Sequence, residues 1–240
     1  MKKNILISTM ALLAGSLLAA DSSPKDDIIA AAKKLADKSN YSWKSTLDLG
    51  PNSQFTPGPT EGKTEKDGCT WLSVTFNDNT TIGLKKGSKV AVKTDDGWKS
   101  GEEASADGGD GNFNAGRFMA TRMTNLKTPA ADVQDLATKT KEIKKDGDTY
   151  SADLTEEGAK SLLAGFGRRG GQAPAPATNA KGSVKFWLKD GALTKYQTKA
   201  TGKREINGEE REIERTTTIE IKDVGTTKLD VPEDAKKKLN

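Results

Sequence analysis

Apolar residues recur along this chain with two periods, one helical and one typical of strands. A spacing of three or four positions predicts a helix, and strict alternation predicts a strand with one buried face. The expected helices cover residues 26–38, 114–126, 129–138, 155–163 and 233–239. The expected strands cover residues 41–49, 72–76, 80–84, 90–92, 141–145, 150–154, 184–188, 194–206 and 209–221. The Gly-rich or Pro-rich stretches 51–66, 101–112 and 165–181 are expected to be loops.

The clearest hairpin signal is Asn207-Gly208, between the last two strands. A two-residue loop of this composition suits the tight turns that join twisted strands. The expected partners are Tyr196 with Ile219, Thr194 with Ile221, Gly202 with Ile213, Lys195 with Glu220, and Lys203 with Glu212. Tyr196 and Ile219 then share a buried face, and the charged pairs lie on the other face.

Two further hairpins are aligned by requiring the apolar side chains to share one face. A three-residue loop over 77–79 pairs Val74 with Ile82, and a slip of one residue would break that arrangement. A three-residue loop over 189–191 pairs Val184 with Tyr196 and gives its glycine a left-handed conformation.

The N-terminus has the three parts of a secretory signal peptide. Two lysines precede an apolar run over residues 5–18, which ends in small residues before Asp21. The run is too short to span a bilayer comfortably, and no cysteine follows it as a lipoprotein signal would require. We expect residues 1–20 to be removed and residues 21–240 to form a single sheet domain with a helical insert. That domain is expected to be periplasmic or secreted, without a stable membrane anchor.

The charge balance argues against nucleic acid as a partner. The chain has 38 Lys and Arg residues, two of them in the signal peptide, so 36 basic residues face 34 acidic ones and the net charge is +2. Hydrophobic residues make up 33% of the chain, and the signal peptide raises that share. We therefore expect a thin core built on a sheet.

Missing residue types exclude several kinds of catalysis. The chain has no histidine and a single cysteine, Cys69. Ser-His-Asp and Cys-His catalysis are therefore excluded, the commonest zinc ligand is absent, and no internal disulfide can form. We expect a protein that is not an enzyme and uses no cofactor or metal. A hydrolase with two carboxylates is the remaining enzymatic alternative.

Two glycine-rich motifs lack the context that would make them binding sites. Residues 165–170 match the dinucleotide fingerprint Gly-X-Gly-X-X-Gly but follow a helix rather than a strand. Residues 107–112 alternate Asp and Gly like a calcium loop, but the position that needs a glutamate is Phe118. Both are interpreted as solvated loops.

Aromatic residues and methionines form one set of candidate ligand-binding residues. They are Trp43, Trp71, Phe118, Met119, Met123 and Phe186. Three lie in strands and three on the helix expected over 114–126. Since methionine repacks around varied shapes, a half-open sheet capped by this helix would hold an apolar ligand. The same residues can also form the filled core of a sheet packed on helices.

The end of the chain resembles a known group of proteins. Segments 218–225 (TIEIKDVG) and 231–235 (VPEDA), with the order of elements, resemble the periplasmic lipoprotein carriers of the Lol type. They are also similar to the related mycobacterial lipid-carrying lipoproteins. The resemblance implies an unclosed, strongly curved antiparallel β-barrel with helices packed in its concave face. It also implies that acyl chains are carried in the concave cleft, although no ligand residue can be matched.

Together, pattern and resemblance predict an α+β protein with a curved, unclosed antiparallel sheet. The expected function is exported, non-catalytic binding or carriage of a lipid or other hydrophobic ligand in the bacterial cell envelope. The alternative is an envelope scaffold or protein-interaction module with a filled cleft.

The signal peptide predicts the N-terminus of the exported protein. Edman or mass-spectrometric analysis should find that it starts at or within a few residues of Asp21, because signal peptidase cleaves after small residues. A cytoplasmic chain that still begins at Met1 would contradict this expectation.

Overall fold

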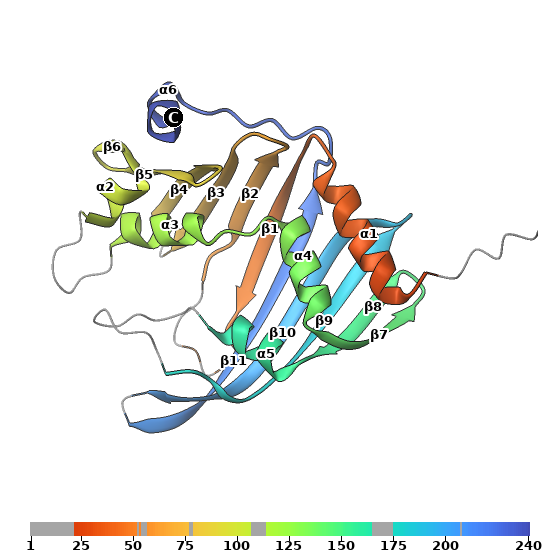
Figure 1. Ribbon diagram of the computed structural model, residues 1–240. Coiled ribbons are helices and arrows are strands. Elements are labelled where there is room, and N and C mark those ends of the chain that lie inside the picture. Colours follow the sequence, from red (N-terminus) through yellow and green to blue (C-terminus); the bar gives the residue numbers. More distant parts are fainter. Residues whose placement is uncertain are drawn as a thin grey trace, which may run out of the picture.

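Most of the chain is arranged around one antiparallel sheet (Figure 1). The computed structural model describes residues 22–51, 53, 57–76, 79–106, 114–164, 175–206 and 208–240. Within these residues the chain forms eleven strands and six helices, the α+β class expected from the sequence. The proposed signal peptide and the motifs 107–112 and 165–170 lie outside the described residues.

The elements have the following bounds. The strands are β1 (Asn40–Asp48), β2 (Thr60–Glu65), β3 (Thr70–Phe76), β4 (Asn79–Lys86), β5 (Lys89–Thr94), β6 (Gly97–Ser100), β7 (Thr140–Asp146), β8 (Thr149–Leu154), β9 (Thr178–Lys189), β10 (Ala192–Ile206) and β11 (Glu209–Lys222). The helices are α1 (Pro24–Ala36), α2 (Gly101–Ala106), α3 (Ala115–Thr124), α4 (Pro129–Thr138), α5 (Glu156–Leu163) and α6 (Glu233–Leu239).

The strand order divides the sheet into two halves. It runs β6-β5-β4-β3-β2-β1-β11-β10-β9-β8-β7, so each half follows the chain and the halves meet where β1 pairs with β11. The outer strands β6 and β7 are edges, so the curved sheet does not close into a barrel (Figure 1).

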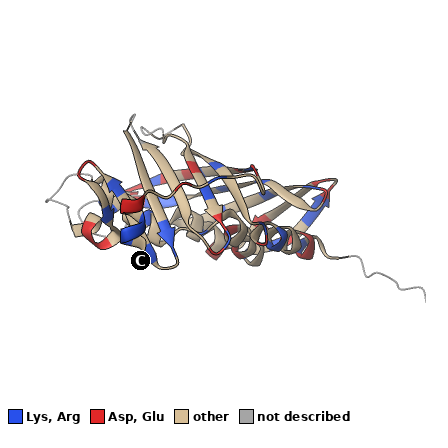
Figure 2. Ribbon diagram, turned by 90° about the horizontal axis from the view of Figure 1, so that it is seen from above, with Lys and Arg blue, Asp and Glu red and all other residues tan. Residues whose placement is uncertain are grey.

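Helices cover both faces of the sheet, but unequally. The main core lies between the concave face and helices α1 to α4, and includes Ile28, Leu72, Val133 and Phe186. A second, smaller core lies on the opposite face of β3 to β5, where α6 covers Leu84. Basic and acidic residues are interspersed over the molecule, in keeping with its nearly balanced charge (Figure 2).

The second core explains why the expected register of β3 with β4 is wrong by one residue. Val74 pairs with Thr81 rather than Ile82, because only two residues separate the strands. The expected register placed every apolar side chain on one face. Here Leu72 belongs to the main core whereas Leu84 packs near α6, so apolar residues are buried on both faces.

The expected register of β9 with β10 is also wrong. Phe186, and not Val184, is the partner of Tyr196. The turn has two residues, Asp190 and Gly191, both with positive φ (52° and 67°). A β-bulge between Leu193 and Lys195 then shifts the pairing by one residue, which returns Tyr196 to the concave face.

The long hairpin of β10 and β11 confirms the alignment set by Asn207-Gly208, although Asn207 itself lies outside the described residues. Four of the five expected pairs form: Tyr196 with Ile219, Gly202 with Ile213, Lys195 with Glu220, and Lys203 with Glu212. Thr194 falls in the bulge, and the partner of Ile221 is Trp43 of β1 instead.

All three stretches expected to be loops contain regular structure, which is β2 in 51–66, α2 in 101–112 and the start of β9 in 165–181. Residues 60–65 form β2, whose inward positions are Thr60, Gly62 and Thr64 rather than apolar residues. The indole of Trp43 fills the space above Gly62, where an added Cβ would lie 2.1 Å from the ring. An alternation of threonine and glycine gives no hydrophobic signal, so sequence patterning missed this strand.

Capping interactions explain why α1 begins earlier than the apolar pattern indicates, and they support α2, which the pattern did not predict. Helix α1 begins at Pro24 because the Ser23 hydroxyl accepts from the Asp26 amide, and the Asp26 carboxylate accepts from the Ser23 amide. Ser100 and Glu103 cap the start of α2 in the same reciprocal way, within the expected loop 101–112. The helices α4 and α6 begin and end as expected, and Thr155 caps α5.

The hairpin register predicts different costs for two neighbouring truncations. Ile219→Ala should destabilise the protein by about 2 to 5 kcal/mol, because Ile219 is buried in the main core. Glu220→Ala should cost only about 0 to 1 kcal/mol, because its ion pair with Lys222 is exposed to solvent. Urea unfolding of the two variants measures both costs, and equal losses would show that the register is wrong.

Candidate functional site

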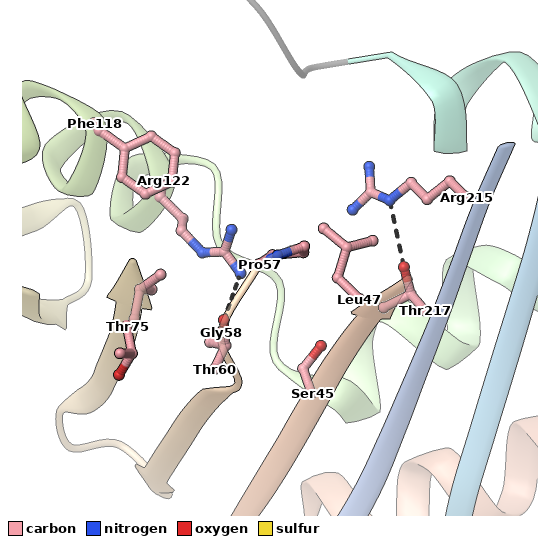
Figure 3. A pocket seen from close by; sticks show the side chains of 11 residues that line it. Ser45, Leu47, Pro57, Gly58, Thr60, Thr75, Phe118, Arg122, Arg215 and Thr217 are labelled. Atoms are coloured by element: carbon pink, nitrogen blue, oxygen red, sulfur yellow. Dashed lines mark hydrogen bonds between the residues drawn. The ribbon is translucent and has the colours of Figure 1, made fainter. Parts of the chain in front are cut away.

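A cavity of about 60 Å³ lies on the concave face, between helix α3 and the strands at the join of the two sheet halves (Figure 3). Its walls come from β1, β2, β3, β11, α3 and the segment before β2. The lining residues are Ser45, Leu47, Pro57, Gly58, Thr60, Val74, Thr75, Phe118, Arg122, Arg215 and Thr217.

The helices of the concave face form two groups, and the cavity lies at the seam between them. Helix α3 packs on α2, β4 and β5, whereas α4 packs on α1, which in turn packs on β10 and β7. Residues 125–128 connect α3 to α4 and cross the seam. The cavity is therefore bounded by side chains of the central strands and of one helical group.

Two arginines face this cavity from opposite sides (Figure 3). Arg122 of α3 donates from Nη2 to the hydroxyl of Thr60 at 3.2 Å. Arg215 of β11 donates from Nε to the hydroxyl of Thr217 at 3.3 Å, and from Nη1 to the carbonyl of Leu162 at 2.9 Å. These three acceptors are neutral oxygens that help to orient the two guanidinium groups.

Burial disfavours the charged form of both arginines. Burial lowers the pKa of Arg215 to about 10, and the charge of Arg122 lowers it as well, whereas Asp132 acts in the opposite direction. Burial also lowers the pKa of Arg122. Both shifts mean that the surrounding protein disfavours the charged form. An anion placed between the two groups would remove that disadvantage.

Near this site, Asp132 of α4 is held by a tyrosine of the sheet. The Tyr196 hydroxyl donates to Asp132 Oδ2 at 2.8 Å, and Tyr196 is itself buried against Phe186. Burial raises the pKa of the Asp132 carboxyl, and the bond from Tyr196 partly offsets the rise. The pair ties α4 to β10 through a polar contact inside the main core.

The structure separates one of the six candidate ligand-binding residues from the rest. Trp71 lies on the face that α6 covers, with the Lys63 ammonium 5.3 Å from its ring centroid. Because successive side chains of a strand point to opposite faces, Trp71 faces away from Leu72, which belongs to the main core. Trp71 therefore cannot share a cleft with the other five.

The other five candidates belong to the concave face, but only one of them lines the cavity. That residue is Phe118; the fully buried Met119, Met123 and Phe186 and the nearly buried Trp43 are part of the main core. Both methionines pack on Gly83 of β4, where an added Cβ would lie 2.5 Å from Met123 Cγ. The methionines therefore fill space between α3 and the sheet, and whether any of these residues binds a ligand stays a prediction.

Sequence reasoning missed the two arginines, although a signal for each exists. In β11, every second residue faces inward, and this series includes Ile213, Arg215, Thr217 and Ile219. Arg215 is therefore a charged residue at an inward-facing position. Arg122 follows Phe118 by four residues and therefore lies on the same helix face. In both the strand pattern and the helix pattern, an arginine occupies a position where an apolar residue is expected, and this could have identified the two residues.

Comparison with known proteins gives only a distant structural likeness. No family model matches this chain, and no curated protein matches its sequence. The structure is similar to lipoprotein LppX of Mycobacterium tuberculosis (TM-score 0.45, 9% identity, 87% of this chain and 97% of that one). It is similar to LprF of Mycobacterium bovis (TM-score 0.44, 10% identity, 87% and 95%). A DUF1329 family protein of Desulfovibrio piger has a TM-score of 0.32 at 12% identity, with 86% and 96% covered.

Two of these three structures are mycobacterial proteins. At identities near 10%, they add nothing about function to what the geometry gives. None of the helices among the described residues is long and apolar enough to cross a membrane. In the same residues no group of three or more Cys, Asp and Glu side chains is placed to hold a metal ion.

Asp132→Asn is expected to change how stability depends on pH. Because burial raises the pKa of the folded carboxyl above the unfolded value of about 4, the unfolded chain releases this proton first as the pH rises. The wild type should therefore lose stability relative to Asp132→Asn between about pH 4 and the folded pKa, while the amide still accepts the bond from Tyr196. Urea unfolding at several pH values measures the difference, and a constant difference would contradict the raised pKa.

Proposed function

We propose that this protein is an exported, non-catalytic binder or carrier of a lipid or other hydrophobic ligand in the bacterial cell envelope. The observation that carries the proposal is the cavity at the seam of the concave face. One wall is apolar, formed by Leu47 of β1, Val74 of β3 and Phe118 of α3. These side chains come from three elements and face one space, the arrangement that an alkyl chain needs.

The size of the cavity determines how such a ligand would enter. At about 60 Å³, it is far smaller than the roughly 300 to 1,000 Å³ of typical ligand sites. An acyl chain would therefore have to part the α2–α3 group from the α1–α4 group. Each buried methylene gains about 0.8 kcal/mol, so a chain of ten carbons could compensate for the side-chain packing that is disrupted when the seam opens.

The described residues of the cavity lack the groups that acid–base catalysis requires. The chain has no histidine, and the described residues that line the cavity include no carboxylate. Carboxylate-dependent hydrolysis needs two such groups converging about 5 to 9.5 Å apart. The cavity offers hydroxyls and guanidinium groups instead, which bind and orient but do not supply a general base.

A second candidate is a scaffold or protein-interaction module with a filled cleft. The small cavity favours it, as does the complete burial of Met119, Met123 and Phe186. A filled concave face would leave only the outer surface for partners. The two candidates differ in whether the seam opens for an alkyl chain.

Titration with a neutral apolar fluorescent probe, N-phenylnaphthylamine, tests the proposed function. The wild type should bind it with micromolar affinity, and Leu47→Gln should bind about tenfold more weakly because an apolar wall is lost. The matched control is Val224→Gln, since Val224 is 41% exposed and lies outside the cavity.

If the wild type does not bind the probe, or if Leu47→Gln binds it equally well while folded, the seam does not open for apolar ligands. The function as a scaffold or protein-interaction module would then be favoured over the function as a carrier.

A further inference from the structure

We propose that Arg122 and Arg215 form an anion site for the head group of the ligand, so that the protein selects amphiphiles with a carboxylate or phosphate head and an alkyl tail. This inference rests on the proposed function and narrows it to one class of ligand. It follows from the position of the two arginines, the polarity of the walls and the size of the space between them.

The two arginines belong to parts of the fold that are far apart in sequence. Arg122 comes from α3, which follows β6 in the sequence. Arg215 comes from β11, the last strand of the chain. Both guanidinium groups point into the same cavity from opposite sides (Figure 3). Guanidinium groups bind carboxylate and phosphate oxygens through paired hydrogen bonds.

The surroundings favour an anion over a neutral head group. No described residue that lines the cavity is acidic, whereas two are cationic and four carry hydroxyl groups. The hydroxyls belong to Ser45, Thr60, Thr75 and Thr217. The neighbouring acid, Asp132, weakly favours the charge of Arg215 but does not line the cavity. Two like charges facing one another repel, and a bound anion would replace that repulsion with attraction.

The dimensions and the apolar wall indicate which part of the ligand occupies the cavity. A space of about 60 Å³ would hold on the order of four water molecules, or one carboxylate or phosphate group, and no alkyl chain. Leu47, Val74 and Phe118 adjoin the arginines, so a chain attached to the head would pass along this wall into the seam. The head group would therefore be held by charge and the tail by the hydrophobic effect.

Isothermal titration with four probes tests this assignment: decyl phosphate, decanoate, decanol and inorganic phosphate. The wild type should bind decyl phosphate and decanoate at least about tenfold more tightly than decanol, as expected for a charged hydrogen bond that decanol cannot make. It should bind inorganic phosphate much more weakly than decyl phosphate, because free phosphate has no tail. Raising the NaCl concentration should reduce the preference for the two anionic probes.

Substitution of each arginine should remove the preference. Arg122→Gln and Arg215→Gln should bring decyl phosphate to within about twofold of decanol. The matched control is Arg117→Gln, which removes the same charge from the exposed side of α3, where Arg117 Nε donates to the Ser105 carbonyl. Circular dichroism would confirm that each variant folds, and Arg122→Lys, which keeps the charge, should retain part of the preference if Arg122→Gln does not fold.

The outcomes separate this inference from the proposed function. Equal binding of decanol and decyl phosphate by the wild type would overturn the anion site and leave the hydrophobic carrier standing. Inorganic phosphate binding as tightly as decyl phosphate would mean a site for a free anion, which also overturns the selection of amphiphiles. If none of the probes binds, both the anion site and the carrier fail.

Discussion

The pairing of β1 with β11 is the interaction on which the rest of the structure depends. Strands β1 to β6 and strands β7 to β11 each form from neighbours in sequence, and only this ladder joins the two sets into one sheet. It aligns Trp43 with Ile221 and Leu47 with Thr217. Each helical group packs mainly on one half, so the distance between the groups also depends on this ladder. A pairing between distant segments costs more chain entropy than a hairpin, which makes it a slow step of folding.

The cavity follows from that arrangement rather than from any single element. Helices that pack on different halves do not cover the central strands completely, and the gap is lined by side chains of both halves. Phe118 and Arg122 reach it from α3, and Arg215 reaches it from β11. The site therefore forms only when the two halves are joined, and its size can change when the helical groups shift.

Much of the fold could be predicted from the sequence, but the burial of apolar residues on the face of the sheet that α6 covers could not. The turn after Ile206 and the strict alternation around Ile219 gave the correct hairpin, since both signals are local. The register of β3 was wrong because α6, far away in sequence, buries Leu84 and Trp71 on the back of the sheet. Strand β2 was missed since Gly62 accommodates Trp43 without any apolar pattern of its own. That Arg122 and Arg215 face one cavity depends on long-range strand pairing, which no local signal contains.

The small core behind β3 to β5 has a consequence for the order in which the chain folds. Leu84 and Ala91 stay uncovered until Ala235 and Leu239 of α6 arrive, and those residues leave the ribosome after every strand has been made. The outer half of the sheet therefore cannot be completed during synthesis, however early its hairpins form.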